Sequence, residues 1–233
     1  MTDALALTPL GPADLAALAF LVIAAFVFGH LAEHPPANRP SVGRLMEAYR
    51  REWMRQFVTR QPRIFDASVI DSLRQGTSFL ASATMIAIGG GVALIGNKEQ
   101  LMGLAEDLTL AGTSSAAWEV KIIVLLLFLT NAFLKFVWSH RLFGYCTIVM
   151  AAVPNEVEDP VALSRAAQAA DLNISAARNF NKGLRAVYFA LATLAWLAGP
   201  LALVGATLVT LGVLGRREFA SASRRALLEG TPK

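Results

Sequence analysis

The chain alternates between long apolar blocks and basic connecting segments. Apolar residues dominate four blocks, at positions 13–32, 77–96, 120–140 and 186–215. A helix needs roughly 20 apolar residues to cross a bilayer core of about 30 Å, because it rises about 1.5 Å per residue. Each block reaches that length. The pattern therefore predicts an all-α fold, a bundle of four transmembrane helices that forms a single integral membrane domain over residues 1–233.

The last block is longer than one upright span needs. Residues 186–215 contain no ionisable side chain except Tyr188, and Gly199 and Pro200 interrupt them near the middle. Two structures fit this run: one tilted helix kinked at Gly199 and Pro200, or a re-entrant hairpin that turns there and returns the tail to its own side. We favour the kinked helix, because proline is tolerated inside membrane helices.

The distribution of basic residues predicts an orientation. The segment 39–74 contains eight arginines, whereas the segment 97–119 contains only one basic residue, Lys98. The positive-inside rule places 39–74 in the cytoplasm, and with it the basic segment 141–185. A single fourth span would leave a basic tail outside, against this rule. The basic residues of that tail are Arg216, Arg217, Arg224, Arg225 and Lys233.

An amphipathic segment at 41–61 separates the first two blocks. Apolar and basic positions recur there at helical spacing, with Ser41 as a suitable N-cap and Pro62 at the end. Such a helix either lies in the headgroup layer, bound to anionic lipid, or packs on the cytoplasmic end of the bundle. Both placements need this pattern. The candidate lipid-facing residues of the helix are Arg44, Arg50, Arg51, Arg55 and Trp53.

A few polar residues lie within or beside the blocks. Asn131 and Lys135 are one turn apart in the third block, where a charge is costly. Lys135 is expected either to extend to the aqueous surface or to pair with Asp71, at a similar depth on the second helix. The candidate polar or structural residues of the membrane domain are Asp71, Arg74, Asn131, Lys135, His140, Arg141, Gly199 and Pro200.

One short string resembles a catalytic motif. His30, Glu33 and His34 match the H-x-x-E-H order of inverted zinc peptidases. Five residues are a weak pattern and a third ligand is needed, so solvation at the membrane interface is the better interpretation. We find no catalytic triad, Walker motif or dinucleotide fingerprint elsewhere. We therefore expect no enzymatic activity, no catalytic residue, no metal and no cofactor.

Small residues recur at every fourth position in two blocks. This spacing lets helix backbones approach closely, so it predicts a tight bundle and allows self-association. The composition agrees with a membrane protein, since 55% of residues are hydrophobic, 16% are charged and the mean hydropathy is +0.50. The two sets of small residues are Ala83, Ala87 and Gly91, and Ala198, Ala202 and Ala206.

Several strings form an ordered pattern over roughly residues 45 to 212. They are YRREWM at 49–54, DSLR at 71–74, KFVWSHRLF at 135–143 and NKGLRAVYFA at 181–190, followed by Trp196, Gly199 and Pro200. Together they resemble a family catalogued as domain of unknown function 599. The resemblance implies multi-pass membrane proteins of bacteria and plants, and it brings no activity, substrate or cofactor with it.

These observations predict a multi-pass protein of a bacterial inner membrane. Its expected surroundings are the lipid bilayer and anionic lipid headgroups, and we expect no nucleic acid partner. The leading hypothesis is a non-enzymatic scaffold or accessory protein that self-associates or packs on a larger membrane complex. The alternative is a small channel or transporter for a small solute or ion, because helix breaks and buried charges often line solute paths.

Overall fold

The computed structural model describes residues 9–97, 103 and 115–229, and all regular secondary structure in these ranges is helical. The all-α prediction is therefore confirmed. The elements are α1 (Pro12–Glu33), α2 (Val42–Thr59), α3 (Ile64–Gly96), α5 (Ser115–Ala151), α6 (Ala162–Leu194), the 3-10 turn η2 (Ala195–Ala198), α7 (Pro200–Phe219) and α8 (Ala222–Glu229).

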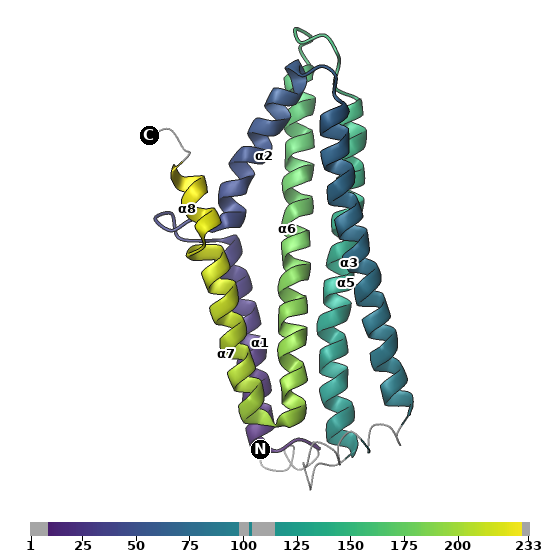
Figure 1. The fold of residues 1–233 in the computed structure, drawn as a ribbon, viewed down its shortest axis with the longest axis vertical. Helices are drawn as coiled ribbons and strands as arrows, with labels where there is room; N and C mark the ends of the chain where they lie inside the picture. Colours follow the sequence, from purple (N-terminus) through teal and green to yellow (C-terminus); the bar gives the residue numbers. More distant parts are fainter. Residues whose placement is uncertain (1–8, 98–102, 104–114, 230–233) are drawn as a thin grey trace.

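Four segments of the described chain are helical, long and apolar enough to cross a membrane. They are α1, α3, α5 and the segment Pro200–Glu229, which contains α7. The number agrees with the sequence prediction, and the less apolar α6 also runs along the bundle between its two ends (Figure 1), so the described chain traverses the bundle five times. The fourth candidate span begins at Pro200, however, and not at residue 186, because the chain breaks its helix just before that proline.

The predicted kinked helix over residues 186–215 is wrong, and the hairpin is correct. The backbone reverses at Gly199, whose φ of 115° lies in a region that side-chain-bearing residues rarely adopt. Pro200 then occupies the first turn of α7, where a missing N–H costs nothing. α7 returns beside α1 and α6 (Figure 1). The hydrogen bond from Arg217 of α7 to Tyr188 of α6 shows the antiparallel pairing.

The helices fall into two length classes. α1 and α7 have 22 and 20 residues, which suits a bilayer core of about 30 Å. α3, α5 and α6 have 33, 37 and 33 residues, and so reach about 50 Å. Their excess length extends past the end of α1, on the side where α2 lies (Figure 1). We call α2 and this excess length the stalk, and its side of the molecule the basic end.

The hairpin brings the described arginine-rich segments to the basic end. The Arg224 Nε donates a hydrogen bond to the Pro40 carbonyl oxygen at 2.9 Å, and the backbone N–H of Gly43 lies 3.4 Å from a Glu218 carboxylate oxygen. The conflict between a single fourth span and the positive-inside rule therefore disappears. Lys98 and Lys233 lie outside the described residues.

This arrangement predicts the side of the membrane that the C-terminal helix faces. A cysteine introduced at the exposed Ser223 should be protected from a membrane-impermeant thiol reagent applied to intact cells. The measurement needs a Cys146→Ala background, although the native thiol is itself fully buried. The control is Pro9→Cys, just before α1 and at the end of that helix away from the basic end; this cysteine should react with the reagent. Labelling of Ser223→Cys without membrane permeabilisation would contradict the prediction.

The core of the stalk joins the amphipathic α2 to the long helices. Met54, Phe57 and Val58 of α2 are almost fully buried in one apolar cluster with residues of α3, α5 and α6. Alanines line the α6 side of this cluster, so the backbones approach closely. The partners from the other helices include Ile70, Leu142, Phe143, Cys146, Ala166, Ala169 and Ala170.

α3 packs on α5 through one narrow stripe. Its buried residues from Ile70 onward are seven positions apart, as in a coiled-coil seam, and continue through Thr77 and Thr84 to Gly91. Gly91 packs on Leu126, where a Cβ would come within 2.6 Å of a side-chain carbon. The other members of the predicted small-residue stripe on this helix, Ala83 and Ala87, are exposed. The stripe from Ala198 to Ala206 is broken by the turn at Gly199.

Candidate functional site

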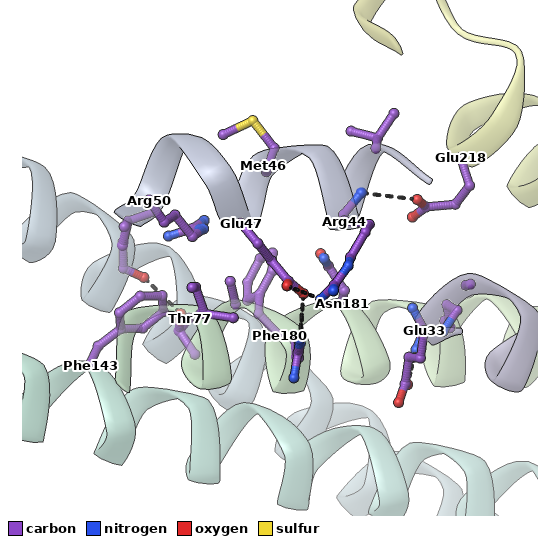
Figure 2. Close-up of a pocket in the computed structure, with 18 of the residues that line it drawn as sticks. Glu33, Arg44, Met46, Glu47, Arg50, Thr77, Phe143, Phe180, Asn181 and Glu218 are labelled. Carbon is purple, nitrogen blue, oxygen red and sulfur yellow. Dashed lines mark hydrogen bonds and ion pairs between the residues drawn. The ribbon is translucent and has the colours of Figure 1, made fainter. Parts of the chain in front are cut away.

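A cavity of about 370 Å³ lies between the bundle and the N-terminal half of α2, which we call the foot of α2. It is level with the end of α1. Residues of α1, α2, α3, α5, α6 and α7 line it (Figure 2). Its volume falls in the range of small-molecule sites, roughly 300–1,000 Å³. The convergence of six elements makes this cavity the strongest candidate site in the described part of the chain.

Glu33 at the end of α1 organises one side of the cavity. Its carboxylate accepts a hydrogen bond from Arg185 at 2.6 Å and forms an ion pair with Lys182 at 2.9 Å. Both cations come from α6, so these bonds hold the end of α1 against that helix. The charge of Glu33 is already neutralised by its two neighbours.

Glu47 of α2 organises a second cluster under the amphipathic helix. It pairs with Arg44 on its own helix at 2.5 Å and with Arg178 of α6 at 2.7 Å. The Glu47 side chain is only 13% exposed, whereas both arginines are at least half exposed. This cluster therefore ties α2 to α6, and the two arginines neutralise the charge of Glu47.

Arg50 is the arginine of the cavity lining that has no carboxylate partner among the described residues. Its guanidinium donates a hydrogen bond to the side-chain oxygen of Asn173, a neutral amide. Burial lowers the pKa of Arg50 from its ordinary value, with a smaller opposing effect from Cys146. A mostly buried cation without a counter-charge is costly, so the end of the cavity at Arg50 favours an anion.

The other predicted lipid-facing residues of α2 bind protein groups. Arg51 forms an ion pair with Asp171 of α6 at 2.7 Å, and Arg55 pairs with Glu52 at 2.7 Å. The indole N–H of Trp53 donates a hydrogen bond to Asp66 at 2.6 Å, and this carboxylate is fully buried. The Trp53 indole N–H thus has a protein partner, and contact of this helix with lipid stays a prediction. Of the two placements considered for this helix, the contacts match packing on the bundle.

The predicted pairing of Asp71 with Lys135 is not present in the structure. Asp71 is exposed and accepts a hydrogen bond from Gln75 at 2.6 Å on its own helix. Lys135 lies with Asn131 in a separate groove of about 590 Å³ between α1, α5 and α6. No ion pair joins Lys135 to another residue in the ranges that the structure describes. Its extension to the aqueous surface stays a prediction.

Three other candidates connect α3 with α5 or stabilise α5 itself. The Nδ1 of His140 lies 3.4 Å from the carbonyl oxygen of Arg74, which joins the two helices. Arg141 donates a hydrogen bond to the Tyr145 hydroxyl at 2.5 Å and lies over its ring. None of these residues lines the cavity or the groove. Their positions indicate structural roles.

The groove that contains Lys135 also receives the residues of the zinc-peptidase string. The rings of His30 and His34 stack with their centroids 4.7 Å apart, and Glu33 between them is engaged by Lys182 and Arg185. In the described ranges, no three histidine, cysteine or carboxylate side chains are grouped so that they could hold a metal ion.

Lys121, which flanks the third apolar block and was expected to be interfacial, is instead buried at the end opposite the stalk. Its side chain is 4% exposed, its Nζ donates to the Trp196 carbonyl oxygen at 3.1 Å, and it lies 4.0 Å from Asp14. The Trp196 indole N–H in turn donates to Asp14 at 2.7 Å. The available signal in the sequence was an acidic residue, Asp14, and a basic residue, Lys121, near the outer ends of two apolar blocks. Gly199 and Pro200 come three and four residues after Trp196, so this network holds the hairpin turn.

These helices define an all-α bundle that carries candidate membrane spans and a stalk at one end. The chain belongs to the family described as Protein of unknown function, DUF599, whose model matches residues 16–223. The resemblance drawn from the sequence strings is thereby confirmed. No curated protein and no solved structure matches the chain significantly.

Proposed function

We propose that this protein is a multi-pass scaffold of the bacterial inner membrane, without enzymatic activity, whose stalk projects into the cytoplasm and docks a partner protein at its tip. The proposal places the basic end in the cytoplasm, in agreement with the positive-inside rule. The partner would be held close to the membrane at a height set by the three long helices.

The observation that carries this proposal is a set of exposed apolar side chains at the tip. Ile64 and Phe65 of α3 are 74% and 64% exposed, Ile148 of α5 is 68% exposed, and Leu163 of α6 is 60% exposed. They lie in the roughly 20 Å of helix that extends past a bilayer core. Apolar side chains exposed on a candidate span face lipid, but those on the stalk would face water.

Exposed apolar clusters on water-facing surfaces commonly mark protein interaction sites. Burial of such side chains against a partner contributes about 25 cal/mol per Å² of apolar area. The basic residues around the stalk keep the remainder of this region soluble. An aromatic residue such as Phe65 is also a typical anchor of a protein interface.

One of the two observations behind the channel hypothesis, the helix break, no longer supports it. The helix break at Gly199 and Pro200 forms a turn at the end of the bundle, where η2 ends, and so does not interrupt a helix in the middle of a span. Asn131 and Lys135 still line a groove, but no further observation favours transport over docking.

Photo-cross-linking in intact cells tests the proposal. A photoreactive amino acid at Phe65 should yield a discrete protein adduct, and the additional change Ile64→Ser should reduce its yield several-fold. The same probe at Ile23 of α1, which is 61% exposed on a candidate span, is the control and should react with lipid. An adduct of twice the chain mass would identify a second copy as the partner. Reaction of the Phe65 probe with lipid or water alone would contradict the proposal.

A further inference from the structure

We propose that the cavity at the foot of α2 binds the phosphate headgroup of an anionic membrane lipid, with Arg50 as its principal contact. The lipid would enter from the side, between α2 and α3, and its acyl chain would follow the exposed face of α3. This proposal is independent of the docking of a partner at the stalk tip.

The charges of the cavity lining leave one cation unmatched. The lining contains four arginines and three glutamates. Glu33 and Glu47 are neutralised by ion pairs, and Glu218 accepts a hydrogen bond from the Gly43 backbone. Arg50 has only the Asn173 amide as a partner. A phosphate oxygen would give this guanidinium the charge-assisted hydrogen bond that it lacks.

A second donor faces the same space. Figure 2 shows Asn181 beneath α2, and Arg50 toward one end of the cavity near Phe143 and Thr77. No hydrogen bond joins the Asn181 side chain to another residue of the described ranges. Its amide N–H groups are therefore available to a phosphate oxygen, and a guanidinium with an amide is a chemically suitable pair of donors for that group.

The position of the cavity favours a lipid over a soluble phosphate ester. Ala32 and Glu33 in its lining mark the end of α1, which is a candidate span, so the cavity lies at the level expected for headgroups. Much of the wall is apolar, with Leu73, Phe143 and Phe180 among its residues. A small soluble anion gains no binding free energy from an apolar wall, whereas an acyl chain is stabilised when it buries its apolar surface there.

An exit for the acyl chain lies on α3. Gly76 lines the cavity, and a Cβ at this position would have no atom within 4 Å. α2 packs mainly on α6, and its hydrogen bond to α3, from Trp53 to Asp66, lies nearer the tip, so the side of the cavity at Gly76 is not closed by these contacts. Phe79, one turn further along α3, is 71% exposed on the candidate span. A lipid tail can therefore run from the cavity onto the surface of the bundle.

Lipid binding to the delipidated full-length protein tests the proposal. Native mass spectrometry should show retained phosphatidylglycerol, and titration should show that Arg50→Gln weakens binding about tenfold or more. The matched control is Arg51→Gln, the neighbouring arginine, which pairs with Asp171 and does not line the cavity. This control should bind the lipid as the wild type does. Equal affinity of the wild type and Arg50→Gln would overturn the proposal.

Two further measurements separate the sources of the phosphate and protect against a folding failure. Soluble glycerol phosphate should not displace the lipid at comparable concentrations, and phosphatidylcholine should bind several-fold more weakly. Displacement by glycerol phosphate, or equal binding of phosphatidylcholine, would overturn the anionic-lipid assignment. Gly76→Leu keeps every charge and fills the exit, so it should reduce phosphatidylglycerol affinity several-fold without lowering Tm. Unchanged affinity in this variant would also overturn the proposal.

Discussion

Lys121→Ala is expected to lower the free energy of unfolding by about 3 kcal/mol. The ammonium is buried, bonds the Trp196 carbonyl oxygen at 3.1 Å and lies over the Trp118 and Trp196 rings at 6.0 and 5.7 Å. Its removal leaves the carbonyl without this donor, takes a cation away from Asp14 and opens a cavity between two tryptophans. The expected loss is large because these three costs arise together at one buried site.

Reversible denaturant unfolding in detergent micelles measures the loss. Lys182→Ala is the matched control, because its side chain is 36% exposed and Glu33 keeps Arg185 as a second partner. An exposed ion pair contributes at most about 1 kcal/mol. Similar losses for the two lysines would show that Lys121 does not hold the turn between α6 and α7.

Gly183→Ala is expected to lower the free energy of unfolding by about 1–3 kcal/mol, although alanine favours helices. A Cβ at Gly183 of α6 would approach three ring atoms of Phe136 of α5 at 2.6, 2.8 and 3.0 Å. Phe136 is fully buried and packs against Phe180, with ring centroids 5.7 Å apart. The ring therefore cannot move away without disturbing the contact between the two helices.

The control for this change is Gly205→Ala in α7, where a Cβ would meet no atom within 4 Å. That variant should be neutral or more stable by up to about 1 kcal/mol, through helix propensity alone. The double variant Gly183→Ala with Phe136→Leu should recover part of the loss, because the smaller side chain leaves room. A Gly183→Ala protein as stable as the Gly205→Ala protein would disprove the close packing of α5 on α6.

The length and hydropathy of the apolar blocks were sufficient for the fold class. They were not sufficient for the path of residues 186–215, because a thirty-residue apolar run fits either one tilted helix or two shorter helices. The decision rests on the positive φ of Gly199 and on the network around Lys121. The arginines after residue 215 were an available clue, since the positive-inside rule already disagreed with a single span.

The amphipathic pattern of α2 predicted a helix and its N-cap, and Ser41 accepts the expected hydrogen bond from the backbone of Arg44. It could not predict the surface that the helix covers, because headgroups and a protein bundle select the same alternation of apolar and basic residues. The partners that decide the placement come from other helices, α3 and α6. They are Asp66 for Trp53 and Asp171 for Arg51.

The chain's local pattern was enough to predict the apolar helices, the amphipathic helix α2 and the places where basic residues concentrate, but not the polar half of α6, which the sequence analysis treated only as a basic segment. These properties depend on local periodicity and on the transfer of each side chain from water, so they can be read along one chain. The tertiary structure alone decided the α6–α7 turn, the separation of Asp71 from Lys135 and the cavity at Arg50. Each of these depends on the rotation and depth of one helix relative to another, which packing between helices sets and which no single segment encodes.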